Sequence, residues 1–237
     1  MCGRYVLTTP GEVLAQIFDT APPPEEILEA IVPRYNISPT QTVPIVRRAA
    51  APAANRELTL VQWGLVPHWA NDPAIGNSLL NARAETAAEK PSFRDAMKRR
   101  RCLIPANGFY EWQKLGKGKQ PWLLRLKSNE TFAFAGLWSQ WKNPESGAKL
   151  ETCAILTTTP NELTARVHDR MPVILPPTTW SLWLDDAPSG TPFTDLFLAF
   201  PAAQMEAFPV SKRVNSPANE GPENIVPVQL AETAAEN

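Results

Sequence analysis

The sequence predicts a single domain of the α+β class, in which antiparallel, barrel-like β-sheets are decorated by short helices. Its 237 residues are enough for one substantial hydrophobic core and require no second domain. Short runs typical of strands dominate the middle of the chain, and helical patterns flank them. The 25 prolines recur at the edges of these runs, which favours short strands joined by rigid turns over a long doubly wound sheet.

The first third of the chain predicts one helix and several extended segments. Residues 9–18 form the helix, in which Thr9 and Glu12 make a capping box around Pro10. Its apolar side chains are expected to share one face: Val13, Leu14, Ile17 and Phe18. The other segments are a proline-rich loop at 21–26, extended structure at 34–48 with bends at Pro39 and Pro44, and a strand within 57–69 that ends at Gly64.

The middle of the chain predicts strands joined by turns. Residues 81–101 begin as a loop and enter an irregular helix that Ser92 caps. An antiparallel series follows, with strands within 102–114, 120–127 and 131–138. The segment 115–119 contains two glycines and is expected to form a hairpin turn.

The last third predicts a strand at 150–159 and a short helix at 159–168. Thr159 is expected to cap this helix, which delivers His168 at its end. Two amphipathic helices, at 178–186 and 193–200, and a last strand at 206–211 complete the fold. Residues 228–237 are small and polar, so we expect the domain to span 2–227 and to end in a flexible tail.

Composition excludes several classes of protein. The formal net charge of -1 argues against a protein that coats nucleic acid by bulk positive charge, although a local basic groove is compatible with it. No run of about 18 apolar residues and no signal-like start is present, so we expect a cytoplasmic protein that does not bind membranes. Three cysteines without CxxC or CxxH spacing predict reduced thiols and no metal site.

A cysteine directly follows the start methionine, in the opening MCGRY. If Met1 is removed, as is usual before a small side chain, Cys2 carries both a free α-amine and a thiol. Their ordinary pKa values, ~7.7 to 8.0 and ~8.5, leave a usable fraction of each deprotonated at neutral pH. With an aldehyde, the amine forms an imine and the thiol then closes a five-membered thiazolidine ring. Position alone also fits a cysteine without a function.

His168 is a candidate for proton transfer. It lies beside Asp169 and Arg170 in RVHDRMPVIL, just before an apolar run. A neutral imidazole suits proton transfer near pH 7, and the flanking charges can tune its pKa. A structural role is the alternative, and His68 in VPHWAND is expected to be a surface residue.

Glu111 is the charged residue among the aromatics of GFYEWQK. In a strand, Phe109 and Glu111 share one face while Tyr110 and Trp112 share the other. If the face of Glu111 lines a pocket, burial raises the pKa of its carboxyl and suits it to acid-base chemistry. If that face is turned outward, Glu111 is an ordinary solvated residue.

Two further motifs carry charge. Asn81, Arg83 and Glu85 occupy every second position of NARAET, and an amide beside a fixed cation can hold a sugar hydroxyl and a phosphate. A capped loop with a solvated charge pair is the alternative. The densest basic run, KRRR at 98–101, is typical of a solvated helix end and by itself identifies no binding site.

Ten fragments, in order and across residues 2 to about 223, resemble the SOS response-associated peptidase (SRAP) family. They are MCGRY, YNISPTQ, WGLVPHWA, NARAET, PSFR, RCLIPANGFYEW, FAGLW, TTTPNE, HDRMPVIL and VNSPANEGPE. The resemblance implies an SRAP-like fold and a sensor of abasic sites in single-stranded DNA. It implies that Cys2 captures the ring-opened sugar aldehyde as a thiazolidine crosslink that shields the lesion during the DNA damage response.

The resemblance also implies roles for individual residues. Asn81 would orient the amine and the sugar, Glu111 would shuttle protons, and His168 would assist opening of the sugar. Residues expected to contact DNA are Arg4, Arg83, Arg94 and Arg170 at phosphates, Trp69 with Pro39 and Thr40 along the DNA path, and Thr157 completing the pocket. We expect a monomer without cofactor or metal that joins the nucleoid on damage.

Two other functions fit the same residues. Cys2, His168 and either Glu111 or Asn81 resemble the nucleophile, base and orienting group of a cysteine peptidase, including one that removes its own Met1. A non-catalytic DNA-binding module is the third candidate, but it leaves the combination of these four residues unexplained.

Overall fold

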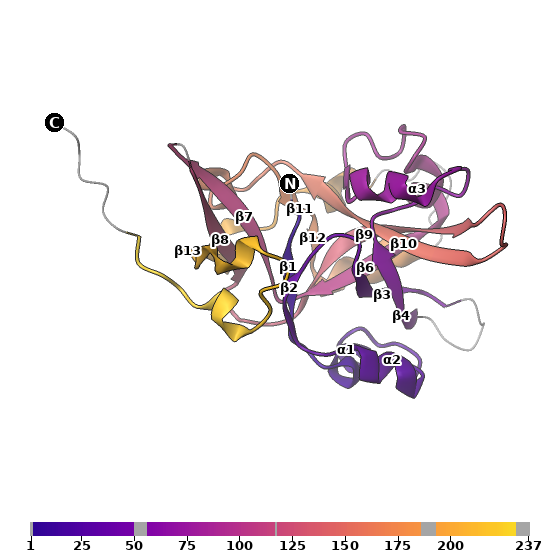
Figure 1. Cartoon of the computed structure of the whole chain (residues 1–237), viewed down its shortest axis with the longest axis horizontal. Helices are drawn as coiled ribbons and strands as arrows, with labels where there is room; N and C mark the ends of the chain where they lie inside the picture. The colour runs from indigo at the N-terminus through magenta and orange to yellow at the C-terminus, as the bar shows by residue number, and fades with distance from the viewer. Residues whose placement is uncertain (1, 50–55, 117, 186–192, 231–237) are drawn as a thin grey trace.

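Five strands close into a barrel at the centre of the molecule (Figure 1). They are β3 (Thr42–Arg48), β4 (Arg56–Trp63), β6 (Arg101–Ala106), β9 (Phe132–Lys142) and β10 (Lys149–Thr158). The pairings run from β4 through β3, β6 and β9 to β10, which returns to β4. Only the β10–β4 pairing is parallel, so the barrel is mixed. The computed structural model describes residues 2–49, 56–116, 118–185 and 193–230.

Three very short strands extend the barrel. β5 (Asn81–Arg83) pairs with β10 in parallel, β11 (Met171–Pro172) pairs with β10, and β12 (Ile174–Leu175) pairs with β9. Gly64 directly follows β4 and begins the segment that leads to β5. Its φ is +129°. A Cβ there would lie 2.7 Å from the carbonyl oxygen of Gly76, so only a glycine fits at this position directly after β4.

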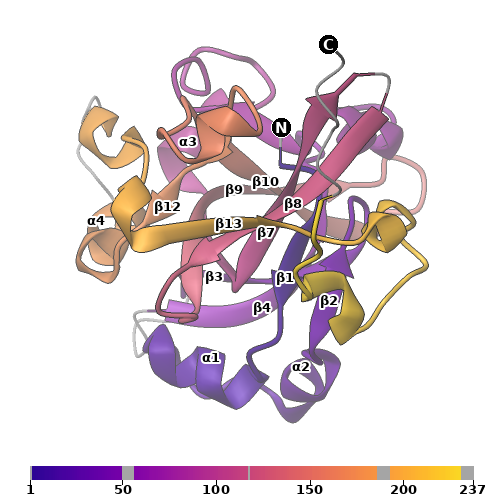
Figure 2. The ribbon, with the colours of Figure 1, turned by 90° about the vertical axis from the view of Figure 1, so that its left-hand side faces the viewer.

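A second sheet lies across the barrel (Figure 2). Its strands, in spatial order, are β13 (Met205–Pro209), β8 (Gly118–Leu126), β7 (Gly108–Leu115), β1 (Tyr5–Leu7) and β2 (Arg34–Ile37), all antiparallel. The predicted α+β class with antiparallel, barrel-like sheets is therefore confirmed. The predicted strand at 102–114 is in fact two strands, because the chain passes from the barrel into the second sheet at Asn107.

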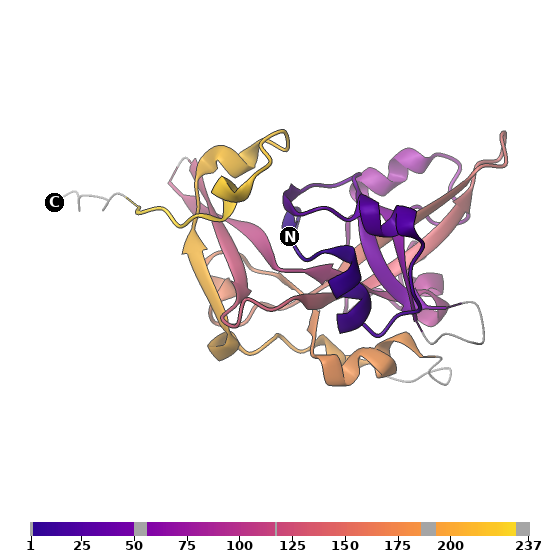
Figure 3. The same cartoon turned by 90° about the horizontal axis from the view of Figure 1, so that it is seen from below.

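Short helices cover the ends of the sheets. The α-helices are α1 (Gly11–Ile17), α2 (Glu25–Ala30), α3 (Arg94–Arg99) and α4 (Trp180–Leu184). The 3-10 turns are η1 (Pro73–Ser78), η2 (Thr164–Arg166), η3 (Pro177–Thr179), η4 (Thr194–Phe197), η5 (Ala202–Gln204), η6 (Lys212–Asn215) and η7 (Pro222–Ile225). Figure 3 shows the C-terminal segment, in yellow, beside the second sheet. In the described part of the chain no helix has the length and apolarity needed to cross a bilayer.

Several predictions about helix ends are wrong. Pro10, not Thr9, is the N-cap of α1, and the Thr9 hydroxyl instead donates to Asn107 Oδ1 at 3.1 Å. Neither Ser92 nor Thr159 caps a helix. In the segment 159–168 the Asn161 side chain accepts a hydrogen bond from the Thr164 N–H at 2.8 Å, and only a 3-10 turn forms.

Other local predictions also need correction. Glu25 and Glu26, assigned to a loop, begin α2. Val13 and Ile17 are exposed, so α1 buries a narrower face than expected. The expected helix at 193–200 is the 3-10 turn η4. Pro44 lies within β3 without ending it, because β6 pairs only with residues beyond it and needs no hydrogen bond from the missing N–H.

Candidate functional site

Strand pairing brings the start of the chain against β7. Tyr5 is opposite Phe109, and the Tyr110 N–H donates to the Arg4 carbonyl at 2.9 Å. Because the two strands are antiparallel, the residues before Tyr5 run beside those after Phe109. Cys2 and Glu111 are thereby neighbours, at 0% and 2% exposure.

Asn81 reaches the same point from the barrel. Its side-chain Nδ2 donates to the Cys2 carbonyl oxygen at 2.8 Å. Its Oδ1 is buried and accepts no hydrogen bond from the described part of the chain. A buried acceptor of this kind favours a donor that arrives from outside the chain. The second sheet and the barrel therefore meet at Cys2.

Burial has the largest effect on the pKa of the Glu111 carboxyl. It raises the pKa of the carboxyl to about 7, against the opposing effect of the positive amino terminus. Of the two orientations considered for this residue, the structure has the buried one, with Phe109 at 0% exposure on the same face. A carboxyl that titrates near neutrality can both donate and accept a proton there.

His168 faces Glu111 from the turn that follows η2. The distance from His168 Nε2 to Glu111 Oε2 is 3.9 Å. His168 Nδ1 accepts the backbone N–H of Arg170 at 3.0 Å, which places the proton of the neutral ring on Nε2. Burial lowers the pKa of His168, although the nearby carboxylate of Asp169 opposes this. The ring is thus neutral near pH 7 and points its N–H toward Glu111.

The Cys2 thiol is protected in the chain that still carries Met1. Burial and the charge of Glu111 raise the pKa of the thiol, whose Sγ donates to the Arg4 carbonyl at 3.9 Å. The nitrogen of Cys2 is a peptide nitrogen in this state. The nitrogen is therefore not nucleophilic until Met1 is removed, and burial keeps the thiol protonated.

Two of the four arginines expected at phosphates are bound within the protein. The Arg170 guanidinium forms a bidentate pair with Glu85 at 2.7 and 2.8 Å and also donates to the Thr157 carbonyl at 2.6 Å. The Arg4 guanidinium donates to Asn36 Oδ1 at 2.7 Å and to the Val214 carbonyl at 2.9 Å. Glu85 itself lies on a turn beyond β5, not on an extended strand with Asn81.

Of the other residues expected to contact DNA, all but Pro39 and Thr157 are exposed. Arg83 and Arg94 are exposed, and Trp69 is 49% exposed. Thr40, which follows the half-buried Pro39, has a φ of +69° and donates its N–H to the Trp63 carbonyl at 2.8 Å. An L-residue with a branched Cβ rarely adopts this conformation. Thr157 is buried behind Arg170.

Sequence reasoning missed two asparagines that support the site. Asn36 is fully buried and holds both Arg4 and the carbonyls of Val214, Ser216 and Asn219. Asn161 orders the turn that carries His168. The available signal was an amide at a position where the strand or turn pattern calls for an apolar or small residue.

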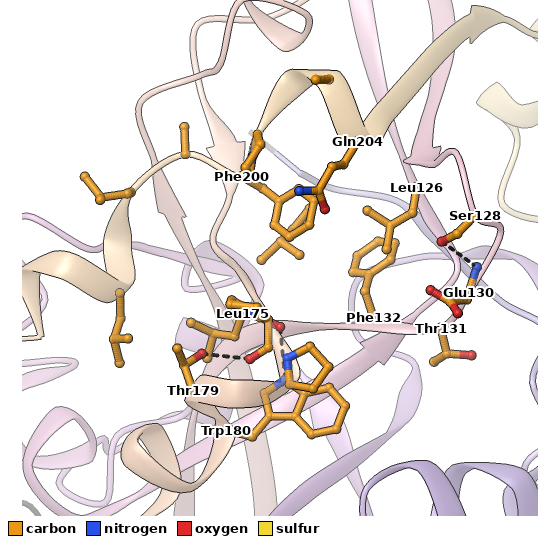
Figure 4. Close-up of a pocket in the computed structure, with 18 of the residues that line it drawn as sticks. Leu126, Ser128, Glu130, Thr131, Phe132, Leu175, Thr179, Trp180, Phe200 and Gln204 are labelled. Atoms are coloured by element: carbon orange, nitrogen blue, oxygen red, sulfur yellow. Dashed lines mark hydrogen bonds between the residues drawn. The ribbon is translucent and has the colours of Figure 1, made fainter.

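The structure offers no second centre of comparable chemistry within its described residues. His, Cys, Asp and Glu side chains do not gather there in any group of three that could hold a metal ion. A pocket of about 790 Å³ lies between the β8–β9 turn and the segments around α4 and η5, and Figure 4 shows Phe132, Trp180 and Phe200 lining it. It contains none of the predicted site residues.

Comparison with known sequences gives a consistent family. A family model described as "SOS response associated peptidase (SRAP)" matches residues 1–217. The chain is 43% identical over 229 residues to abasic site processing protein YoqW of Bacillus subtilis (strain 168), covering 95% of this chain and 99% of that protein. It is 30% identical over 237 residues to abasic site processing protein YedK of Escherichia coli (strain K12), covering 96% and 100%.

Solved structures agree in fold. A crystal structure of a protein from Bacteroides thetaiotaomicron superposes with a TM-score of 0.86 at 27% identity, covering 96% of this chain and 100% of that one. A second, from Bordetella bronchiseptica, has a TM-score of 0.71 at 25% identity and covers 89% and 100%. The barrel with its crossing sheet is thus shared over nearly the whole chain.

Proposed function

Because this chain belongs to the SOS response associated peptidase (SRAP) family, we propose that it processes abasic sites in DNA and crosslinks to them through Cys2. Relatives that it matches along almost their full length are named abasic site processing proteins. The observation that carries the proposal is the convergence of Asn81, Glu111 and His168 on a cysteine at the second position. These residues come from both sheets, and each has a use in aldehyde chemistry.

The proposed reaction requires removal of Met1, which frees the α-amine of Cys2. The amine adds to the aldehyde of the ring-opened deoxyribose, and loss of water gives an imine. The thiol then adds to the imine carbon and its proton passes to the nitrogen, which closes the thiazolidine. No redox partner is needed, and the DNA stays attached through two new bonds.

Each neighbouring residue has a place in these steps. Glu111, titrating near pH 7, donates a proton to the departing water and then accepts the thiol proton. The neutral His168 presents its Nε2–H toward Glu111, where it assists opening of the sugar ring. Asn81 holds the Cys2 backbone through Nδ2 and offers Oδ1 to the amine or a sugar hydroxyl.

Recognition in single-stranded DNA follows from the lesion itself. An abasic site has no base to bind, so contacts must go to the backbone and to neighbouring bases. The formal net charge of -1 fits a protein that neutralises only a few phosphates. Moderate affinity is sufficient when capture is covalent.

A second candidate is removal of Met1 by the same site. Glu111, whose charge raises the pKa of the Cys2 thiol, is an acid-base group next to the residue that follows Met1. Peptidase action on other proteins lacks such support. The contact of the Cys2 thiol is with the Arg4 carbonyl, whereas His168 faces Glu111.

The test is incubation with single-stranded DNA that carries one abasic site. Protein whose mass shows loss of Met1 should give a complex that survives heat and SDS. Cys2→Ala and methoxyamine treatment of the DNA should each abolish it. Cys153→Ala, a matched loss of a buried thiol, should leave it unchanged.

Two further outcomes separate the mechanisms. Cys2→Ser with a free terminus should retain an imine that borohydride traps but lose the durable product; unchanged durability would remove the thiol from the reaction. Repeated Cys2-dependent turnover of a peptide panel would favour the peptidase, and processed protein that ignores abasic DNA would refute the crosslinking proposal.

A further inference from the structure

His168 lies on a short segment that its own backbone bonds hold only in part. The 3-10 turn η2 has three residues, and Val167 and His168 donate their N–H groups to the Thr164 carbonyl at 2.8 and 2.9 Å. The fully buried Thr164 and the side chain of Asn161 fix the start of the segment. Its end, from Arg166 onward, needs contacts with other elements to place the imidazole.

Gln113 supplies such a contact from β7. Its side-chain Nε2 donates to the Arg166 carbonyl at 2.9 Å, two residues before His168 in the chain. Gln113 also lies two residues after Glu111 in β7, so both side chains are on the same face of the strand. One strand thus bears Glu111 and also holds the segment that brings His168 to it.

Trp122 fixes the orientation of the Gln113 amide. Trp122 Nε1 donates to Gln113 Oε1 at 3.0 Å. Because an indole N–H can only donate, it selects the oxygen end of the amide and leaves Nε2 for the Arg166 carbonyl. Trp122 is paired with Glu111 in the register of β7 and β8, so it lies on the same face of the sheet. These bonds form a chain from β8 through β7 to the segment of His168.

The distance between His168 and Glu111 requires positioning of this kind. His168 Nε2 and Glu111 Oε2 are 3.9 Å apart, which is beyond the range of a hydrogen bond. Their spacing is therefore set by the backbone segments that carry them and not by a direct bond between these two atoms. On the downstream side of His168, the bidentate pair with Glu85 holds Arg170. Gln113 is the corresponding contact on the upstream side.

Resting on the proposed function, we propose that Gln113 is a positioning residue for opening of the sugar ring, because its bond to the Arg166 carbonyl keeps His168 directed at Glu111. Without this bond the segment moves away from β7, and the imidazole becomes more exposed to solvent. Glu111 keeps its place, since β1 and β8 hold β7 from both sides. The loss therefore falls on ring opening and not on imine or thiazolidine formation at Cys2.

The test compares two substrates in Gln113→Met, which keeps the approximate size of the side chain and removes both hydrogen bonds. One is a single strand with an abasic site, whose sugar must open before it reacts. The other is a single strand with an open-chain aldehyde that cannot cyclise. In Met1-free protein, single-turnover crosslinking of the abasic strand should be about 3- to 10-fold slower, the loss expected from one ordinary hydrogen bond. Crosslinking of the open-chain strand should stay within about two-fold of the unsubstituted rate.

The titration of the imidazole is a second readout, which needs no DNA. Burial and the positive charges of the amino terminus and Lys119 lower the pKa of His168, whereas Asp169 raises it. Glu111 has a pKa of about 7, so it is mostly uncharged while His168 titrates. Burial is the largest of these effects, and exposure of the ring should therefore raise the pKa of His168 toward its ordinary 6.5.

Side-chain NMR can follow this titration residue by residue. The chain has two histidines, so His68→Gln assigns the signals of His168. Gln113→Met should raise the pKa of His168 above its value in the unsubstituted protein. An unchanged titration would overturn the positioning role.

Gln120→Met is the matched control, because Gln120 is paired with Gln113 in the same hairpin but bonds elsewhere. Gln120 is 7% exposed, and its Nε2 donates to the carbonyls of Pro121 and Val210 at 2.9 and 2.8 Å. The control should lower the Tm more than Gln113→Met does. It should nevertheless leave the titration of His168 and the ratio of the two crosslinking rates unchanged. Equal effects in both variants would indicate a general loosening of the hairpin and overturn the proposal.

Failure of the proposed function gives a different result. If the unsubstituted, Met1-free protein crosslinks neither strand, the function is refuted, while the titration of His168 in Gln113→Met still tests the contact. If the unsubstituted protein crosslinks both strands and Gln113→Met slows both equally, the role in ring opening is refuted and the function stands.

Discussion

Glu111 combines near-complete burial with a titration near neutrality. Its carboxyl keeps its proton in the folded protein up to a pKa of about 7, whereas the ordinary value is 4.5. A raised folded pKa stabilises the fold below pH 4.5, and this stabilisation is lost as pH rises through 7. The loss amounts to about 3 kcal/mol for an otherwise isolated group.

Glu111→Gln should therefore alter how stability depends on pH. The amide cannot ionise, so the free energy of unfolding of the variant should rise relative to the unsubstituted protein between pH 4.5 and 7.5, by up to about 3 kcal/mol. Urea unfolding at a series of pH values measures the difference. If the difference in unfolding free energy does not change with pH, Glu111 does not titrate in this window. The same variant should also form the DNA crosslink about 100-fold more slowly, because it cannot transfer protons.

Asn81 links the barrel to the start of the chain through one hydrogen bond. Asn81→Ala removes the bond to the Cys2 carbonyl and the buried acceptor Oδ1, so the amine loses its fixed position. We expect crosslinking about 10- to 100-fold slower, with the fold retained. Single-turnover rates on abasic DNA measure this, with the exposed Asn77→Ala as control. A rate within two-fold of the control would exclude an orienting role.

The residue types of the site were readable from the sequence, but their contacts were not. Periodicity places Glu111 and Phe109 on one face of a strand, yet only the pairing of β7 with β1 decides that this face is buried. The partner of Arg170 could not be predicted from the sequence either. Glu85 and Arg170 are 85 positions apart and meet because β5 and β11 both pair with β10.

At the scale of elements, local sequence patterns predicted the positions of strands well and the capping residues of helices poorly. The alternation of apolar residues predicted β4 and β10. The glycine-containing turn predicted the hairpin of β7 and β8. The capping box at Thr9 failed because Asn107, far along the chain, competes for the threonine hydroxyl. Propensity carries no information about such tertiary partners.

The turn between β2 and β3 holds a strained threonine. Thr40 has a φ of +69°, which costs an L-residue roughly 1 to 2 kcal/mol. Thr40→Gly should remove this strain and, after the added entropy of the unfolded glycine, stabilise the protein by about 0.5 to 1 kcal/mol. Thermal unfolding measures the change. Thr42→Gly, in regular β3 structure, should have the opposite sign, and a lower Tm for Thr40→Gly would contradict the strain.

At the scale of the whole molecule, the C-terminal segment supports the residues that lead from Cys2 into β1. Arg4 lies two residues after Cys2 and donates to the Val214 carbonyl at 2.9 Å, while its guanidinium sits 5.9 Å from the centre of the Trp112 ring. Asn36 holds the other side of the same segment. The buried Asn36 amide thus joins the start of the chain to its C-terminal segment.

Asn36→Ala should break this junction. The change leaves the Arg4 guanidinium without its Oδ1 acceptor and strips a donor from the carbonyls of Ser216 and Asn219, in a position of 0% exposure. Loss of a buried polar network of this kind costs about 2 to 4 kcal/mol. The segment around η6 and η7 should also become the first site of limited proteolysis.

Urea unfolding and mass mapping of the first proteolytic cut measure the two effects, with the exposed Asn71→Ala as the matched control. Crosslinking should fall together with stability, since β1 loses the support that aligns Cys2 with Glu111. If Asn36→Ala loosens residues 211–227 but crosslinks at the normal rate, β1 holds its position through β7 alone. The pairing of β1 with β7 would then be sufficient to align Cys2 with Glu111, and the C-terminal segment would serve stability only.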